Sequence, residues 1–304
     1  MNSKKIKSYI IISNGNGGIA TFQKYLIKNI IKISSKIYLI DRKKNPTEKY
    51  FQKINIKNKT NYLYCDPILE PKKVLKNLDF LKKKNSQEKL IFIFSNPLLL
   101  IMYIFLIKFK FNNKKIYLFI HSHILKYSFS QILINFISSL ISPLTDKVFF
   151  VSKFTRSWWL KYFFFYNFSN NEVHLNSVQL PKLRKKKLRI INIGFVGRLE
   201  KEKGVNIFFN LAKHMKNSEF KFHMFGDGSI KSKEFKNKNI FKYKWSNQEK
   251  IFKIIDILLL TSPIENCPFS VLEAKSYGIP TLSISKGGVK EIIENYKDGI
   301  ILEE

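Results

Sequence analysis

Short apolar runs alternate with longer amphipathic segments along the whole chain. Alternation of this kind is typical of βαβ units, in which parallel strands are covered by helices on both faces. The sequence therefore predicts an α/β fold with parallel sheets. The expected strands are Ser8–Ser13, Ile37–Ile40, Leu90–Phe94, Ile116–His121, Lys147–Val151, Ile190–Val196, Phe220–Phe225, Ile257–Thr261 and Thr281–Ile284.

A basic run that starts with a proline, Pro181–Arg189, separates two patterned halves. Beyond it a new strand leads to Gly197, as it would at the start of a second Rossmann-like unit. The 304 residues are enough for two domains of ordinary size. We therefore expect a boundary near Leu180, with one domain over residues 1–180 and a second over 181–304.

The formal net charge of +32 raises the question of a nucleic-acid partner. Only five of the 54 basic residues are arginine, and the lysines accompany heavy use of Ile, Asn and Phe, as in proteins of AT-rich genomes. Because base readers and phosphate clamps favour arginine, we expect no nucleic-acid partner. An anionic membrane surface is the expected partner, since each lysine near a leaflet adds about 1 kcal/mol.

The longest oily stretch, Leu90–Phe111, is interrupted by an Asn-Pro pair, whereas a membrane span needs about 20 apolar residues. The apolar run Ser8–Ser13 is too short for a secretory signal. Cys65 and Cys267 form no metal or disulfide pattern, which fits a reducing cytosol. We expect a cytoplasmic protein that associates peripherally with the inner face of the cell membrane.

The aromatic-rich segment Ser157–Phe168 allows two interpretations. It is either a core helix with an aromatic face or an interfacial anchor, because Trp and Tyr beside lysines suit the headgroup level. Lys161 does not suit a fully buried helix. The sequence leaves both interpretations open.

A glycine cluster, Gly15–Ala20, lies directly after an expected strand and before an expected helix. Glycines there let the backbone turn sharply and bring N–H groups close to a phosphate. With Asp41 ending the second strand, the cluster also resembles a dinucleotide fingerprint. The pattern fits a dehydrogenase, a sugar transferase or a tight turn equally well.

In the second half, the segment Ile193–Gly204 runs from a strand into a turn that bears Arg198 and Lys203. Two cations at the carboxyl end of a strand are placed for a diphosphate, which the arginine fork can hold bidentately. The alternative is a solvated charged loop. The scarcity of arginine in this chain favours the diphosphate-binding interpretation for Arg198.

The segment Ser262–Gly278 follows another buried strand. Pro268 suits the first turn of a helix, and the N–H groups of Phe269 and Ser270 would then be directed at an anion. Glu265 precedes this helix, whereas Glu273 lies about one turn inside it. Carboxylates accept hydrogen bonds from sugar and ribose hydroxyls, so the pair suits a ligand with a diphosphate and hydroxyls at both ends.

Glu265 and Glu273 are separated by seven residues, which resembles the E-x7-E signature of the family 4 (group 1) retaining glycosyltransferases. This resemblance implies the GT-B fold, with two Rossmann-like domains facing across a cleft. It also implies that the first domain binds the acceptor and the second binds the nucleotide-sugar. The resemblance extends to Gly197–Leu199, Lys203–Gly204, Phe225–Gly228, Gly278–Pro280, Gly287–Gly288 and Glu291, and, as closing strands of the first domain, to Asp146–Ser152 and Glu172–Asn176.

The resemblance assigns roles to residues at the matching positions. Glu273 would accept hydrogen bonds from the donor ribose, and Glu265 would bind hydroxyls of the transferred sugar near the anomeric carbon. A histidine, either His121 or His123, would lie near the sugar or the acceptor. The donor diphosphate would be held by Arg198, Lys203, the backbone at Gly17 and Gly18, and the helix start at Phe269 and Ser270.

The implied reaction transfers a sugar from a nucleotide-diphosphate sugar to a glycan or lipid-linked acceptor with retention of configuration. It implies a role in bacterial cell-surface polysaccharide or lipopolysaccharide synthesis. No D-x-D pair stands at an expected strand end, so we expect no metal and no cofactor beyond the donor, which is a co-substrate. Electrostatic stabilisation of the leaving diphosphate and positioning would then supply the catalysis.

The family pattern continues with further helices beyond the point where this sequence ends, so the second domain is expected to be short at its C-terminus. Three alternatives stay open. Gly15–Ala20 and Asp41 also fit an NAD-dependent oxidoreductase, which leaves Arg198 and the two glutamates unexplained. A nucleotide-sugar epimerase of the same fold would share the donor site, and an inactive truncated transferase would keep the fold without the reaction.

Overall fold

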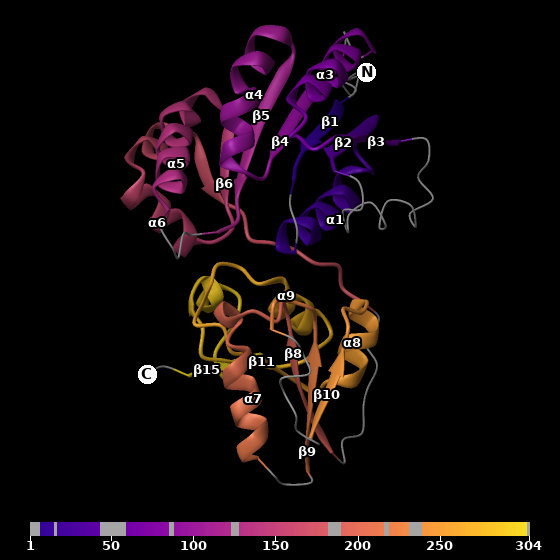
Figure 1. Cartoon of the computed structure of the whole chain (residues 1–304), viewed down its shortest axis with the longest axis vertical. Helices are drawn as coiled ribbons and strands as arrows, with labels where there is room; N and C mark the ends of the chain where they lie inside the picture. Colours follow the sequence, from indigo (N-terminus) through magenta and orange to yellow (C-terminus); the bar gives the residue numbers. More distant parts are fainter. Residues whose placement is uncertain are drawn as a thin grey trace. The chain divides into compact units, whose positions relative to one another are not determined.

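A computed structural model describes residues 7–14, 17–42, 59–84, 88–122, 128–181, 190–215, 219–230 and 239–302. The chain divides into two compact units, Met1–Leu175 and Asn176–Glu304. The expected boundary at Leu180 lies a few residues later, in the same irregular segment. Each unit contains its own parallel sheet with helices against it (Figure 1), so the predicted α/β fold class with parallel sheets is confirmed.

The first unit is built on a seven-stranded sheet with the order β3-β2-β1-β4-β5-β6-β7. Every neighbouring pair is parallel; Ile10, for example, is in register with Tyr38 on one side and Phe92 on the other. The strand order changes direction at β1, where a doubly wound sheet forms a crevice at its carboxyl edge. The strands are β1 (Lys7–Ile12), β2 (Lys36–Asp41), β3 (Thr60–Tyr64), β4 (Lys89–Phe94), β5 (Lys114–Ile120), β6 (Lys147–Phe150) and β7 (Asn171–Val173).

Local sequence signals fix the helix starts of this unit. Asn96 caps α4, because its side chain accepts the N–H of Leu98 at 2.9 Å. Ser152 caps α6 in the same way, through the N–H of Thr155 at 3.0 Å. The helices are α1 (Gly18–Ile30), α3 (Pro71–Lys84), α4 (Pro97–Lys110), α5 (Phe129–Ile141) and α6 (Lys153–Tyr162), with 3-10 turns η1 (Ser142–Leu144) and η2 (Phe164–Phe168).

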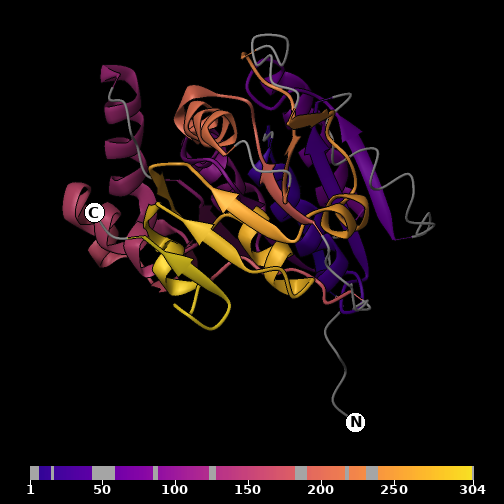
Figure 2. The ribbon, with the colours of Figure 1, turned by 90° about the horizontal axis from the view of Figure 1, so that it is seen from below.

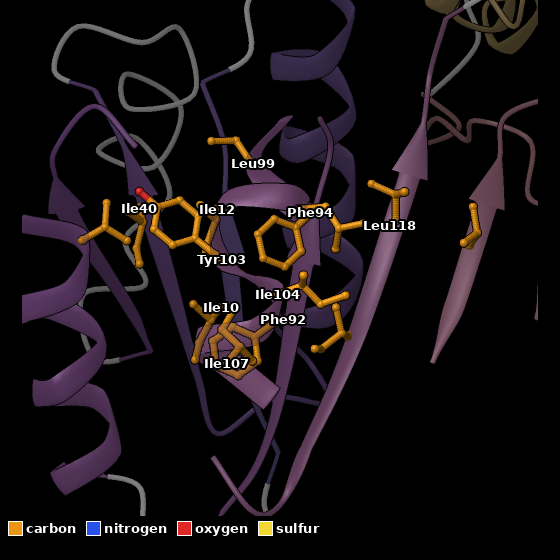
Figure 3. Packing of buried hydrophobic residues seen from close by; sticks show 14 of the residues in the cluster. Ile10, Ile12, Ile40, Phe92, Phe94, Leu99, Tyr103, Ile104, Ile107 and Leu118 are labelled. Atoms are coloured by element: carbon orange, nitrogen blue, oxygen red, sulfur yellow. The ribbon is translucent and has the colours of Figure 1, made fainter. Parts of the chain in front are cut away.

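The core of the first unit lies between the central strands and helix α4 (Figure 3). The sheet contributes aromatic and branched side chains, against which α4 packs a buried tyrosine and two isoleucines. This packing explains the oily stretch that the sequence shows here: it is a buried strand followed by a largely buried helix. The labelled members are Ile10, Ile12, Ile40, Phe92, Phe94, Leu99, Tyr103, Ile104, Ile107 and Leu118.

The second unit is built on a six-stranded parallel sheet with the order β10-β9-β8-β11-β13-β15, whose strands run side by side in Figure 2. Its core includes Phe208 of α7 and Phe222 of β9, whose ring centroids are 5.7 Å apart. The strands are β8 (Ile191–Val196), β9 (Phe220–Phe225), β10 (Ile240–Tyr243), β11 (Ile257–Leu260), β13 (Thr281–Ser283) and β15 (Gly299–Ile301), with a separate pair, β12 (Ile264–Glu265) and β14 (Lys286–Gly287). The helices are α7 (Val205–His214), α8 (Gln248–Ile254) and α9 (Phe269–Ser276), with 3-10 turns η3 (Lys201–Lys203) and η5 (Gly288–Glu291).

The nine expected strands are present, with ends that differ by one or two residues. Strands β3, β10 and β15 and the short pair β12 and β14 were not expected. Their residues are mostly half-buried or exposed, so they lack the continuous apolar run that marks a buried strand.

The aromatic segment Ser157–Phe168 forms part of α6 and the turn η2. The core interpretation holds for three of its rings, because Trp159, Phe163 and Tyr166 are buried in the first unit. Three others, Tyr162, Phe164 and Phe168, are exposed. Within the described ranges, no helix combines the length and the apolar character that crossing a bilayer requires.

Candidate active site

A lysine and a glutamate meet at the carboxyl ends of two neighbouring strands of the second unit. Lys203 ends the turn that follows β8, and Glu265 lies in β12, shortly after β11. The Lys203 Nζ lies 2.6 Å from the Glu265 Oε1, and the Ser262 Oγ donates to the same oxygen at 2.8 Å. With 27% and 13% of their side chains exposed, the two groups are shielded enough to hold a defined geometry.

Gly204 makes this approach possible. Its φ of 67° lies in the left-handed region, and a Cβ at this position would stand 2.0 Å from the Thr261 carbonyl oxygen. The Thr261 hydroxyl in turn donates to the Lys203 carbonyl at 3.0 Å. The turn after β8 is thus fixed against the end of β11 by backbone contact, and this contact places Lys203 beside Glu265.

The loops after β8 and β9 continue the ladder between these strands. Gly197 and Leu199 donate backbone N–H groups to the carbonyls of Phe225 and Asp227, both at 3.1 Å. A Cβ on Gly226 would lie 1.8 Å from the Gly197 carbonyl oxygen, so only glycine allows this spacing. Gly197 and Gly226 therefore allow the two loops to pack closely through their backbones. This packing holds the loop that carries Arg198.

Arg198 lies in this loop but does not contact the two signature glutamates. Its Nη2 pairs with the Glu202 carboxylate one helical turn further along, and both side chains are about half exposed. An exposed pair of this kind contributes less than about 1 kcal/mol. A diphosphate can therefore replace Glu202 as the partner of the guanidinium at little cost.

Helix α9 begins at Phe269, with Pro268 as its N-cap residue. The predicted helix start is thus present, one residue after the proline. The first N–H groups of any helix have no acceptor within it and carry partial positive charge. Ahead of the helix, Asn176 fixes the loop, because its Nδ2 donates to the Cys267 carbonyl at 2.8 Å. Burial raises the pKa of the Cys267 thiol to about 11, so this side chain packs as a small neutral group.

Glu273 is buried inside α9, where its carboxylate accepts a hydrogen bond from the Gln248 side chain at the start of α8. The two signature carboxylates are therefore both withdrawn from bulk solvent, and each has a polar partner, as buried charges require. Ser262, Gln248 and Thr261 were not singled out from the sequence. Ser262 and Thr261 had no signal except that they lie next to a motif in the sequence. Gln248 had no signal at all.

Three further candidates belong to the first unit. Gly17 and Gly18 are exposed at the start of α1, after β1, and a Cβ on either would meet nothing within 4 Å. His121 follows β5, and its ring centroid lies 4.4 Å from that of Phe22. Burial lowers the pKa of His121 to about 4, so the ring is neutral at neutral pH, and its buried Nε2 has no partner among the described residues. His123 lies outside the described residues, as do Gly15 and Asn16.

Asp41, the possible ribose ligand of a dinucleotide site, is fully buried at the end of β2. Its Oδ1 accepts the backbone N–H of Arg42 at 2.8 Å. Across the described ranges, no three His, Cys, Asp or Glu side chains gather in a group that could hold a metal ion.

Most of the second unit is similar to a known protein family. Residues 180–304 match the family described as glycosyl transferases group 1. The lipopolysaccharide 1,6-galactosyltransferase of Salmonella typhimurium is 35% identical over 129 residues, which cover 37% of this chain and 34% of that protein. The chain spans about a third of the length of the bacterial curated relatives that it matches.

Solved structures resemble nearly the whole chain. The apo form of the lipopolysaccharide outer core galactosyltransferase WaaB gives a TM-score of 0.66 at 21% identity, covering 98% of this chain and 86% of that one. HepE of Anabaena in complex with UDP-glucose gives a TM-score of 0.75 at 12% identity, covering 97% and 85%. At these identities the similarity concerns the fold, and it confirms the GT-B fold class.

Proposed function

We propose that this chain, whose residues 180–304 match the glycosyl transferases group 1 family, moves a sugar from a nucleotide-diphosphate sugar to a glycan or lipid-linked acceptor. The observation that carries the proposal is the Lys203–Glu265 pair, held with Ser262 at the ends of β8 and β11. It joins a cation suited to phosphate and a carboxylate suited to sugar hydroxyls. The loop that carries Glu265 leads directly into the start of α9.

We propose that the donor contacts these groups along its whole length. Lys203, Arg198 and the first N–H groups of α9, at Phe269 and Ser270, would hold the diphosphate, aided by the backbone at Gly17 and Gly18 of the first unit. Glu265 would accept hydrogen bonds from the sugar, and Glu273 from the ribose. The nature of the donor is supported by the HepE complex, which contains UDP-glucose.

The proposed reaction proceeds with retention and without a metal. The acceptor hydroxyl oxygen bonds to the anomeric carbon on the face from which the diphosphate departs, while the bond from that carbon to the diphosphate oxygen breaks. The departing phosphate oxygen takes the hydroxyl proton. Positive charge from Arg198, Lys203 and the α9 start stabilises the leaving diphosphate, and a neutral His121 or its neighbour His123 contacts the sugar or the acceptor.

The first unit, under this proposal, is the acceptor domain, and the product belongs to bacterial cell-surface polysaccharide or lipopolysaccharide. The support is the similarity to lipopolysaccharide galactosyltransferases. The alternative, a nucleotide-sugar epimerase of the same fold, would share the donor site but would need no acceptor domain.

We further propose that the protein works in the cytoplasm at the inner face of the cell membrane. The support is the formal net charge of +32, which attracts the protein to anionic lipid. Binding to anionic vesicles should weaken as salt rises, because the attraction is screened within a Debye length. Binding that is indifferent to salt would refute this electrostatic attraction.

The decisive experiment is a panel of UDP-, GDP- and ADP-sugars, read by released nucleotide diphosphate. With the active donor, Glu265→Ala and Arg198→Ala should each lower kcat/KM by about tenfold or more, which is about 1.4 kcal/mol of barrier. Glu249→Ala and Lys201→Ala, at exposed charges of the same unit, are the matched controls. Activity within about threefold of wild type for either site variant would show that the site is assigned wrongly.

Thermal shift on the same donors separates the alternatives. Stabilisation by NAD and not by any nucleotide-sugar would indicate the oxidoreductase. Stabilisation by a nucleotide-sugar that is never turned over would indicate a transferase fold retained only for binding.

A further inference from the structure

Helix α5 exposes five of its apolar residues on one side. Phe129, Ile132, Leu133, Phe136 and Leu140 are between 40% and 82% exposed. Their spacing of three or four residues puts them on one stripe of the helix. These five residues are called the α5 face.

The fully buried residues of α5 are polar, and the half-buried Ile134, Ile137 and Ile141 lie beside them. Asn135, Ser138 and Ser139 face inward. The Ser138 hydroxyl shares a 2.6 Å hydrogen bond with the buried Tyr166 hydroxyl, and the Ser139 hydroxyl donates to the Phe136 carbonyl at 2.8 Å. Rolling the helix to bury its apolar stripe would break the bond to Tyr166 and expose the small side chains that allow close packing. The inverted orientation is therefore fixed.

Neighbouring elements extend the apolar surface. Helix α4 packs beside α5 (Figure 1) and exposes Phe105 and Phe109. The turn η2 also packs on α5, where the Phe136 and Phe165 rings meet edge to face at 6.1 Å. Apolar side chains that are exposed on three packed elements indicate an interaction site.

The sequence segment that forms this surface is strongly basic. Between Pro97 and Phe168 the sequence contains eight lysines and one arginine but a single acidic residue, Asp146. That carboxylate is paired with Lys115 at 2.6 Å, and Lys110 and Lys147 pair with Asp79 and Glu172 from outside the segment. Exposed lysines include Lys161, whose ammonium lies 5.4 Å from the centroid of the Tyr162 ring. A second copy would present the same positive charge, so self-association through this surface is opposed, whereas an anionic lipid surface complements it.

We infer that the α5 face inserts into the interfacial layer of a bilayer with anionic headgroups. The apolar stripe leaves water for the acyl boundary while the surrounding lysines remain at the headgroups, as in interfacial helices. This goes beyond the proposed function, because attraction by net charge alone needs no apolar stripe. Vesicle binding is measured without a donor, so it stands or falls separately from the transferase reaction.

The test compares two triple variants on phosphatidylglycerol and phosphatidylcholine vesicles. Ile132→Gln/Leu133→Gln/Phe136→Gln removes the centre of the α5 face. Its matched control is Ile33→Gln/Leu69→Gln/Phe80→Gln, which makes the same three changes at exposed positions elsewhere on the first unit. The α5 variant should lose roughly tenfold or more of its partitioning onto phosphatidylglycerol vesicles, and the control should match wild type.

High salt distinguishes apolar insertion of the α5 face from electrostatic attraction to the headgroups. In about 1 M salt, where the Debye length is about 3 Å, wild type should keep residual binding and the α5 variant should keep none. Equal binding by the α5 variant and wild type would overturn the inference, and so would equal losses in the two triple variants.

A labelled cysteine tests the same point without removing the stripe. Cys65 and Cys267 are both buried, so a dye reacts at an introduced thiol instead. An environment-sensitive dye on Ile132→Cys should shift to the blue with phosphatidylglycerol vesicles, whereas the same dye on Leu69→Cys should not. An unshifted spectrum at position 132 would overturn the inference. A lipid-free wild-type dimer that the α5 variant converts to monomer would also overturn it, in favour of an interface between copies.

Discussion

At the scale of single residues, the candidate site depends on a glycine that carries no chemistry. Gly204 allows the turn after β8 to touch the end of β11, and Lys203 reaches Glu265 because of that contact. A side chain at position 204 would act twice: it would strain the backbone, and it would push the two strand ends apart.

Gly204→Ala should therefore destabilise the protein more than Gly278→Ala. Both glycines have a φ near 70°, so each alanine meets a backbone penalty of about 1–2 kcal/mol. Only position 204 adds a collision, since a Cβ at 278 meets nothing within 4 Å. The measurement is urea unfolding of both variants, and equal losses would show that the turn relaxes freely.

The Lys203–Glu265 pair should show a measurable coupling. In a double-mutant cycle with Lys203→Ala and Glu265→Ala, we expect a coupling of about 1 kcal/mol in the free energy of unfolding, because the pair is partly shielded. The exposed pair Lys253 and Glu249 offers a control cycle with a smaller value. The same coupling in both cycles would mean that burial adds nothing.

His121 should make the protein less stable in acid. Its folded pKa of about 4 lies below the ordinary value of 6.5, because burial disfavours the charged ring. Between these values the unfolded chain binds a proton that the folded chain does not, so stability falls as pH drops through this window. The contribution is at most about 1.4 kcal/mol per pH unit.

His121→Phe should flatten the pH dependence of unfolding between pH 4 and 6.5. The aromatic replacement keeps a ring against Phe22 and Phe119, so the fold is retained. His214→Gln, at an exposed histidine of α7, controls for the loss of an imidazole. An unchanged slope in His121→Phe would contradict the buried neutral ring.

The motifs in the sequence located the charged site residues but not their partners. The places of Arg198, Lys203, Glu265 and Glu273 after expected strands, and the resemblance to a family motif, singled these residues out. The contact of Lys203 with Glu265 depends on how two separate segments fold. A single serine or glutamine has no distinctive sequence pattern in a lysine-rich chain. Gln248 and Ser262 therefore become recognisable only in the structure.

At the scale of elements, α5 shows what a periodic pattern can and cannot predict. Its apolar residues repeat as they do on a surface helix, and this repeat ordinarily identifies the side that faces the core. Here the buried side is the one with Asn135, Ser138 and Ser139. Periodicity identifies a face of a helix, whereas the neighbours of the helix decide where that face points.

Ser138→Ala should therefore destabilise the protein although it replaces a polar residue by an apolar one inside the fold. It leaves the buried Tyr166 hydroxyl without its partner, at a cost of about 1–3 kcal/mol. Tyr166→Phe alone should have a similar cost, and the double variant should lose less than the sum. Additive losses in thermal or urea unfolding would mean that the two hydroxyls act independently.

Strands were predictable where they are buried on both sides. The apolar runs that became β1, β4, β8 and β11 contain enough consecutive Ile, Leu, Val and Phe to be recognised. Edge strands β3 and β10 and the short β15 are half-buried and polar in part, so their sequences do not differ from loops. The order of strands in each sheet also came from the structure, because periodicity contains no pairing information.

At the scale of the whole molecule, each unit has a buried core of its own. Phe92→Ala in the first core and Phe208→Ala in the second should each destabilise by about 3–5 kcal/mol. In calorimetry we expect each variant to lower a different transition. A nucleotide-sugar should raise the transition that Phe208→Ala lowers, because ligand binding stabilises the unit that holds it. One transition shifted equally by both variants would contradict this expectation.

The strand order of the first unit bears on how the chain leaves the ribosome. Strand β1 is synthesised first and occupies the interior of the sheet, between β2 and β4, while β5, β6 and β7 follow outward in the order of the chain. Once β4 has emerged, each new strand finds its neighbour already in place. Before that moment, one side of β1, whose residues are almost all buried in the folded unit, has no partner from its own chain. The interval between the translation of β1 and that of β4 is consequently when the nascent chain is most exposed to aggregation and most in need of a chaperone.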